Sequence, residues 1–364
     1  MPVFTGQVVT PIGIESARII VEGDRIERIE RVPGQRGSLI VPGFIDLHCH
    51  GGGGADVMEG AESVKRMAEV HTRHGTTSLL ATTMTDSVEA VESALNGIGA
   101  AMNVAQPGSA AVLGVHLEGP FISPDKLGAQ PDAAIPGDLD LIKRWMALAP
   151  IRVVTCAPEA DPEGTLTAFL NRSGVRVQIG HSDCSYETAA RCFESGRHGV
   201  THMFNAMSAL NHRAPGVAGA ALAHAEFAEL IPDLLHVHPG AIRAALRAIP
   251  QLYAVTDATP AAGMPDGDFR LGTQLVRKCG NGVRLADGTL AGSSLTMIDA
   301  FRNLVSIGMN VAEAARRCST IPADYLGLTD RGRLCAGAVA DLLVLGEDLT
   351  LQQVCVAGEM VETG

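Results

Sequence analysis

The sequence has few basic residues and no paired-cysteine motif. It holds 28 Lys and Arg against 40 Asp and Glu, which leaves a formal net charge of −12 at pH 7. A nucleic-acid backbone would require a basic face on its partner, so we expect no nucleic-acid binding, although one or two local cations would be enough for a small phosphorylated substrate. The eight cysteines are scattered, without a Cys-x-x-Cys pair or a framework spacing. This usage favours a reducing compartment.

Long apolar runs are also absent. The first 20 residues have neither a basic start nor a continuous apolar core, so we expect no signal peptide. A long uncharged stretch at 97–117 contains Asn103, Gln106 and the breaker pair Pro107-Gly108, and it cannot span a bilayer as one helix. We therefore expect a cytoplasmic protein that does not bind membranes.

The sequence does contain a regular alternation of short apolar runs and amphipathic segments. Eight near-continuously apolar runs are expected to be strands buried on both faces: 43–48, 77–82, 111–117, 151–156, 175–180, 199–202, 227–231 and 252–256. Helical segments are expected between them, at 64–71, 88–98, 138–148, 163–171, 186–194 and 239–248. Eight strand–helix units in about 250 residues predict a parallel (β/α)8 TIM-type barrel. A doubly wound open sheet is the alternative, but no Gly-x-Gly-x-x-Gly turn follows the first strand to support it.

The two ends of the chain have a different pattern. Residues 1–42 and 332–364 contain short strands separated by turn signals and no helical pattern. We expect both termini to form one small β-sandwich domain, with the barrel at 43–331 inserted between them. Asn-Gly and Asp-Gly pairs within 269–290 predict a hairpin before a helix at 294–307.

Two histidines one residue apart end the first predicted strand. Side chains at i and i+2 share one face of a strand, so His48 and His50 should point the same way. Such a pair can be merely two polar residues at a strand end. Four further ligand-type side chains, however, follow other predicted strands: Glu118, His181, His202 and Asp257. The carboxyl ends of barrel strands form the active-site face, so we expect all six side chains to converge there.

This set of side chains has the chemistry of a metal-dependent hydrolase. Imidazole and carboxylate ligands suit Zn²⁺, Fe²⁺ or Mn²⁺, and an ion with an open coordination position activates water near neutral pH. A carboxylate that bridges two ions and another that moves a proton would complete the site. Two nearby residues are expected to have packing roles. Cys49 should face the opposite side of its strand, and His116 should lie in the inner layer of the barrel.

Several motifs resemble those of the amidohydrolase superfamily. The run PGFIDLHCHG at 42–51 is similar to the superfamily's strand-one signature. Six further stretches are similar, in the same order, to the branch that deacetylates N-acetylated amino-sugar 6-phosphates: 116–120, 180–182, 201–207, 213–216, 255–259 and 292–297. The resemblance extends from about residue 42 to the C-terminus.

The resemblance implies metal-dependent hydrolysis of the N-acetyl group of N-acetylglucosamine 6-phosphate, which gives glucosamine 6-phosphate and acetate in amino-sugar catabolism. Six positions match the family's metal site: Glu118, His181 and His202 for the principal ion, His48 and His50 for a second ion, and Asp257 as the catalytic carboxylate. The implied cofactor is a divalent metal, Zn²⁺ first and Fe, Mn or Co as alternatives, with one or two ions per subunit.

The resemblance also implies a set of substrate-binding positions: Gln130, Asn205, Ala206, Arg213 and His236. In known members an arginine at the position of Arg213 contacts the sugar phosphate from the neighbouring subunit, which implies a homodimer with shared sites. Gln130 occupies a position where the family usually has histidine. Glutamine can donate a hydrogen bond there, but it cannot carry a proton.

Two other functions remain open at this stage. A related enzyme could act on N-acetylgalactosamine 6-phosphate or on a different N-acyl compound. A catalytically silent barrel could serve as a scaffold, but such a derivative should have lost ligands, and all six are present here.

Overall fold

The eight apolar runs form the strands of a barrel. The computed structural model describes residues 2–34, 37–104, 106–194 and 198–362. The barrel strands are β5 (Phe44–Cys49), β8 (Thr76–Thr83), β9 (Ala111–Glu118), β10 (Ile151–Thr155), β11 (Arg176–Ile179), β12 (His198–Val200), β13 (Phe227–Leu230) and β14 (Gln251–Ala254). Each lies within two residues of its predicted bounds. Every residue of β5 and β8 is buried, as expected for strands covered on both faces.

Parallel pairing closes these strands into a ring. Six of them pair in the order β12-β11-β10-β9-β8-β5, and β13 pairs with β14. The segment after β14 joins β5, because the N–H of Asp257 donates to the carbonyl of His48 at 2.8 Å. On the other side, the N–H of Met203 donates to the carbonyl of Glu229 at 2.8 Å and links the end of β12 to β13. The predicted barrel is therefore confirmed.

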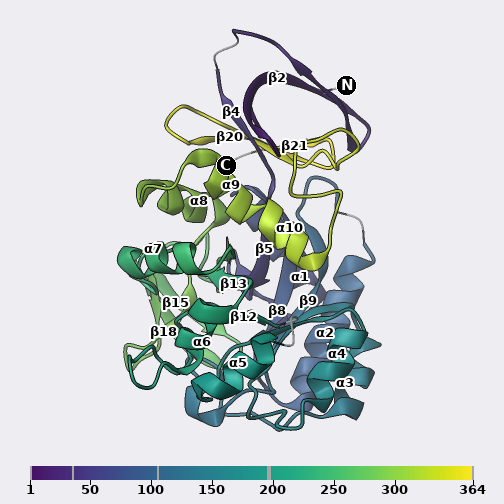
Figure 1. Cartoon of the computed structure of the whole chain (residues 1–364). Coiled ribbons are helices and arrows are strands. Elements are labelled where there is room, and N and C mark those ends of the chain that lie inside the picture. Colours follow the sequence, from purple (N-terminus) through teal and green to yellow (C-terminus); the bar gives the residue numbers. More distant parts are fainter. Residues whose placement is uncertain (1, 35–36, 105, 195–197, 363–364) are drawn as a thin grey trace.

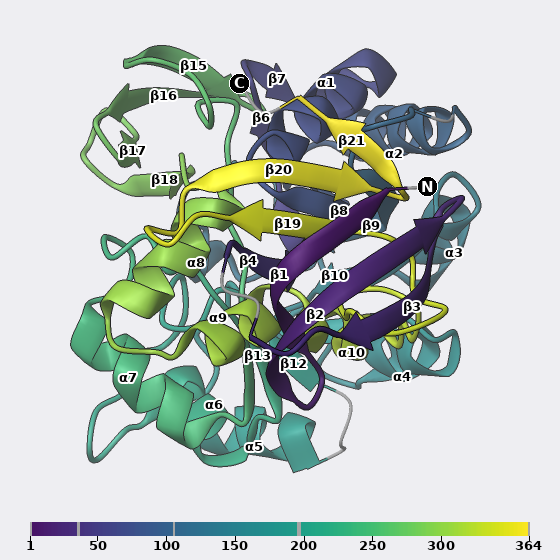
Figure 2. The ribbon, with the colours of Figure 1, turned by 90° about the horizontal axis from the view of Figure 1, so that it is seen from above.

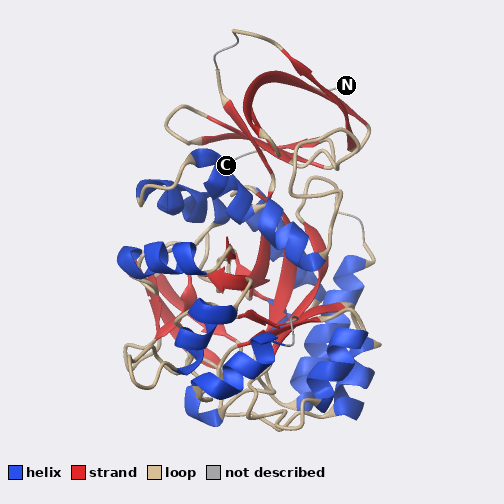
Figure 3. Ribbon diagram, viewed as in Figure 1, coloured by secondary structure: helices blue, strands red, loops and turns tan. Residues whose placement is uncertain are grey.

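Helices cover the outside of the barrel (Figures 1 and 3). They are α1 (Ala61–Thr72), α2 (Val88–Met102), α3 (Leu139–Met146), α4 (Thr165–Arg172), α5 (Tyr186–Glu194), α6 (Gly216–His224), α7 (Pro239–Ala248) and α8 (Met297–Ser306). Two more, α9 (Val311–Cys318) and α10 (Thr320–Leu326), lie between the barrel and the terminal sheet in Figure 1. The sequence pattern did not predict α6, because its small apolar residues are buried on nearly all sides and show no amphipathic period.

Strands from both termini form one seven-stranded sheet (Figure 2). Its order is β21 (Glu359–Val361), β20 (Leu351–Val356), β19 (Leu342–Leu345), β4 (Leu39–Pro42), β1 (Val3–Thr10), β2 (Gly13–Glu22) and β3 (Arg25–Arg31). We expected a sandwich, but the N-terminal and C-terminal strands join edge to edge. The reason is that β4 pairs in parallel with β1 on one side and antiparallel with β19 on the other.

A separate antiparallel sheet lies beside the barrel mouth. It contains β15 (Gly267–Leu271), β16 (Gln274–Cys279), β17 (Gly282–Arg284) and β18 (Leu290–Ser293), so the predicted hairpin is two strands larger than expected. Short elements follow β5 and β9: the strand pair β6 (Gly51–Gly52) and β7 (Ala55–Asp56), and the 3₁₀ helices η1 (Val57–Glu59) and η2 (Pro124–Lys126). The loops at this end of the barrel therefore form the walls of a pocket.

Among the helices of the described residues, none is both long enough and apolar enough to cross a membrane.

Candidate metal and catalytic site

The six predicted metal-site side chains meet at the carboxyl ends of the barrel strands. Five of them line one cavity of about 240 Å³, whose wall also includes residues of β15 and β18, and the sixth, His48, lies against His50 with their Nε2 atoms 3.1 Å apart. None of the six is more than 8% exposed. Packing alone does not explain why four histidines and two carboxylates are buried in one cluster. Burying polar groups costs free energy unless they are paired or bind a metal.

Glu118, His181 and His202 form the first group of ligand atoms. Glu118 Oε1 lies 3.1 Å from Nε2 of each histidine, and the two Nε2 atoms are 3.1 Å apart. Ligand atoms at 2.0–2.2 Å from a tetrahedral zinc ion are themselves about 3.3 Å apart, so this group fits such an ion. The His181 Nδ1–H donates to the carbonyl of Lys126 at 2.8 Å, which leaves the Nε2 lone pair directed into the group.

His48, His50 and Asp257 form a second group beside the first. The two Nε2 atoms are 3.1 Å apart, and His50 Nε2 lies 3.2 Å from Asp257 Oδ1. The other oxygen of Glu118, Oε2, lies 3.1 Å from His50 Nε2. One carboxylate therefore contacts both groups, which is the arrangement needed to bridge two ions.

Three of these residues have left-handed backbones that aim their side chains. The φ angles are 48° at His181, 27° at His202 and 51° at Asp257. Such a conformation in a residue other than glycine costs of order 1–3 kcal/mol and is found mainly at functional sites. At each of these three residues the chain turns away from the direction of the preceding strand, and the side chain is directed over the barrel mouth.

The charged side chains of the site shift one another's pKa values. Burial alone would raise the pKa of Glu118, but the imidazoles of His48, His181 and His202 outweigh burial and hold that pKa well below its usual range. Burial alone would lower the pKa of His50, yet the carboxylates of Asp257 and Glu118 raise it to about 9. Without metal, His50 therefore holds a proton at neutral pH, and a bound cation would displace it.

The predicted substrate-binding residues divide into two sets. Four of them line the same cavity: Gln130, Asn205, Ala206 and His236. Arg213 is exposed, contacts His212 at 2.9 Å, and is not among the described residues that line this cavity.

Gln130 contacts the Glu118 carboxylate directly. Its Nε2 donates to Glu118 Oε2 at 2.6 Å, and its Oε1 accepts from the N–H of Thr85 at 2.7 Å. The glutamine therefore holds the same oxygen of Glu118 that contacts His50, a role that the sequence did not predict.

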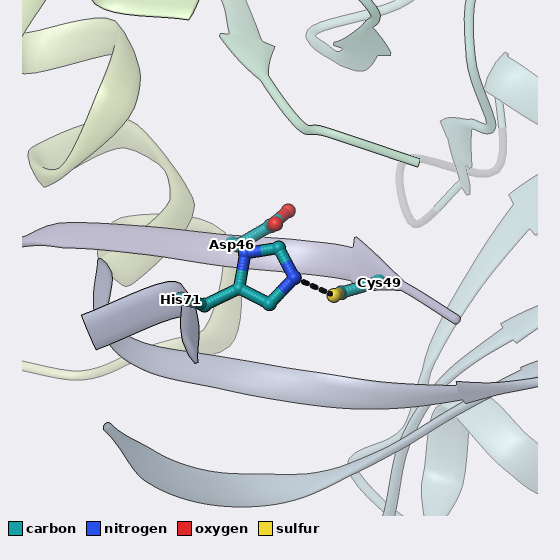
Figure 4. A group of neighbouring side chains, drawn as sticks. All are labelled: Asp46, Cys49 and His71. Atoms are coloured by element: carbon teal, nitrogen blue, oxygen red, sulfur yellow. Dashed lines mark hydrogen bonds between the residues drawn. The ribbon is translucent and has the colours of Figure 1, made fainter. Parts of the chain in front are cut away.

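Both expected packing residues contact groups outside the ligand cluster. The Nδ1–H of His116 donates to the Leu47 carbonyl at 3.0 Å, and its Nε2 contacts the Thr155 hydroxyl at 2.8 Å. Cys49 faces the opposite side of β5 and lies beside Asp46 and His71 (Figure 4), with its Sγ 3.3 Å from His71 Nε2. Burial raises the pKa of Cys49 and lowers that of His71 to about 4, so this pair is neutral at physiological pH.

Sequence reasoning missed Glu229, whose Oε2 lies 2.9 Å from His48 Nδ1. A signal was present, because Glu229 is the one charged residue in the apolar run 227–231. The pattern could not show which residue this carboxylate contacts.

A (β/α)8 barrel that gathers histidines and carboxylates at its strand ends defines a class of metal-dependent hydrolases. Residues 39–361 match the amidohydrolase family. The chain belongs to this family and, within it, to the N-acetylglucosamine-6-phosphate deacetylases, on the similarities that follow.

The similarity to these relatives extends over nearly the whole chain. N-acetylglucosamine-6-phosphate deacetylase of Lysinibacillus sphaericus is 40% identical over 335 residues, which cover 89% of this chain and 86% of the relative. N-acetylgalactosamine-6-phosphate deacetylase of Escherichia coli O157:H7 is 38% identical over 333 residues, covering 88% and 87%. The crystal structure of N-acetyl-D-glucosamine-6-phosphate deacetylase from Mycobacterium smegmatis superposes with a TM-score of 0.92 at 32% identity, covering 100% of both chains.

Proposed function

We propose that this chain removes the acetyl group of N-acetylglucosamine 6-phosphate with the help of divalent metal, giving glucosamine 6-phosphate and acetate. The observation that carries the proposal is Glu118, whose two oxygens contact two separate groups of ligand atoms at 3.1 Å. A bound divalent cation would lower the pKa of water and polarise the acetyl carbonyl. Nitrogen and oxygen ligands at tetrahedral spacing favour Zn²⁺, with Fe, Mn or Co as alternatives.

Asp257 is placed to move the proton in this reaction. Its Oδ1 lies 3.2 Å from His50 Nε2, and its side chain faces the cavity. The imidazoles of His48 and His50 outweigh burial and lower the pKa of Asp257, so the group is a carboxylate that can accept a proton. Water adds to the acetyl carbon and gives its proton to Asp257. Asp257 then protonates the amide nitrogen as the carbon–nitrogen bond breaks.

A relative supports this choice of substrate. An aspartate-to-alanine mutant of the Mycobacterium smegmatis deacetylase, a chain 32% identical to this one, has been solved in complex with N-acetyl-D-glucosamine-6-phosphate. The galactosamine isomer is the second candidate, because the Escherichia coli relative acts on it by name at 38% identity. Comparing kcat/KM for the two 6-phosphates, with amine release as the readout, decides between them.

Phosphate recognition gives a first test of the proposal. The Zn²⁺-loaded protein should strongly prefer N-acetylglucosamine 6-phosphate over N-acetylglucosamine. Arg213→Ala should lower kcat/KM for the phosphorylated sugar by about 10–100-fold, the loss expected for one hydrogen bond to a charged group. The same change should leave kcat/KM for the unphosphorylated sugar unaltered. Arg247→Ala, on the exposed surface of α7, is the control. Activity on neither sugar, with metal bound, would contradict this substrate.

A subunit-mixing experiment tests the proposed homodimer. Arg213 is exposed in the single chain, which supports a role in the site of a neighbouring subunit. If so, unfolding and refolding a mixture of Arg213→Ala and Asp257→Asn should restore activity, because one site of each heterodimer has Asp257 from one subunit and Arg213 from the other. If Arg213 serves its own subunit, the mixture should stay as inactive as its components.

A further inference from the structure

Glu229 is a buried carboxylate that the proposed reaction does not use. It lies on β13 and is 0% exposed. Its Oε2 lies 2.9 Å from His48 Nδ1 and 3.3 Å from the N–H of His202, and the Tyr253 hydroxyl donates to Oε1 at 3.4 Å. Burying a carboxylate in the middle of a barrel is costly unless specific partners compensate it.

Glu229 is not itself placed as a ligand of a third ion. The nearest candidate set would combine it with His48 and His116. Both ring nitrogens of His116 already have partners, at the Leu47 carbonyl and the Thr155 hydroxyl. The Nδ1 of His48 is directed at the Glu229 carboxylate itself, so this set has no nitrogen left for a metal.

The contact with Glu229 determines how His48 presents its other nitrogen. In a neutral imidazole, an Nδ1–H that donates to a carboxylate leaves Nε2 unprotonated, and this pairing makes the ring a stronger metal ligand. His48 Nε2 then lies 3.1 Å from His50 Nε2 and 3.5 Å from Asp257 Oδ1. The carboxylate also limits rotation of the ring, because His48 is fully buried and has contacts at both nitrogens, Nδ1 with Glu229 and Nε2 with His50.

The other ligand histidines have weaker support. The Nδ1 atoms of His50 and His181 donate to the neutral carbonyls of Thr82 and Lys126. Nδ1 of His202 is buried without a hydrogen-bond partner in the described part of the chain. Of the four, His48 is the one whose Nδ1 meets a carboxylate, and it belongs to the second group of ligands.

We propose that Glu229 is a positioning residue that holds His48 as a ligand and thereby sets the affinity of the His48–His50–Asp257 group for its ion. This inference rests on the proposed function, because it assumes that the two groups hold metal. Glu229 contributes little to the first group, where it contacts only the backbone N–H of His202. The two ions should therefore respond differently to its loss.

Metal occupancy measured without reference to activity tests the inference. Full-length wild-type protein, Glu229→Gln and the exposed control Glu226→Gln are dialysed against Zn²⁺ buffered at stepped free concentrations, and zinc per chain is measured by mass spectrometry. Wild type and Glu226→Gln should reach two ions. In Glu229→Gln the second ion should need about 10–100-fold more free zinc, the usual effect of losing such a partner, while the first binds as in wild type. Glu229→Asp, which keeps the charge, should lie between them and serves if the glutamine variant fails to fold.

A double mutant shows whether Glu229 acts through His48. Adding Glu229→Gln to His48→Asn should change zinc occupancy no further than His48→Asn alone. The inference is overturned if Glu229→Gln binds both ions like wild type, if both ions weaken equally, or if wild type holds a single ion. Wild-type protein that binds no zinc, iron, manganese or cobalt would instead overturn the proposed function.

Discussion

Asp257→Asn is expected to lower kcat for deacetylation by roughly 10²–10⁴-fold, the range for loss of a general acid–base group. Asparagine has nearly the same shape as aspartate but cannot accept the proton of water or deliver it to the departing nitrogen. The contacts of Glu118 with His181 and His202 do not involve Asp257, so the first ion should still bind. Amine release and zinc per chain, measured on the same preparation, separate the two effects.

Asp140→Asn provides the matched control for this change. Asp140 lies on α3 with its side chain 95% exposed and pairs with Lys143 on the same helix, so its substitution should leave kcat unchanged. Activity within threefold of wild type in Asp257→Asn would assign the proton transfer to another group.

Glu118→Gln should have a comparable effect for a different reason. Glu118 is the charged ligand shared by both groups, and each oxygen lies 3.1 Å from a histidine nitrogen. The neutral amide removes this charge and presents an NH₂ group to one side, so both ions should bind more weakly. Because a metal ion contributes several kcal/mol to such a reaction, kcat/KM should fall by at least about 10³-fold.

The two variants should differ in whether the loss of activity is accompanied by a loss of bound zinc. In Glu118→Gln zinc content should fall with activity, and added zinc should restore part of the rate; in Asp257→Asn zinc should not restore it. Glu62→Gln, whose side chain is 88% exposed on α1, is the control for the charge change. Full zinc occupancy in Glu118→Gln would contradict the bridging role of Glu118.

Much of the site could be predicted from local sequence because its candidate ligands are tied to strand ends. His48 and His50 share one face through the two-residue period of a strand, and this period also turns Cys49 away. Glu118, His181, His202 and Asp257 follow apolar runs that form parallel strands, and parallel strands in a barrel end on one side. For these residues, local spacing was enough to predict convergence.

The pairs that support the ligands could not be predicted in this way. Glu229 meets His48 across 181 residues of sequence, and Gln130 reaches Glu118 from a loop after β9. These contacts depend on the stagger of the strands and on how the barrel closes, to which residues far apart in the sequence contribute. The same holds for the terminal sheet, where β4 joins the two ends of the chain edge to edge.

The sequence by itself determined the eight strands, the face on which the ligands lie and the class of chemistry they support, because each depends on spacing within a few residues. Only the tertiary structure decided that Glu118 contacts both groups, that Glu229 contacts His48, and that Arg213 lies outside the cavity of its own chain. These features depend on distances between strands and loops, which long-range packing fixes and local periodicity does not record.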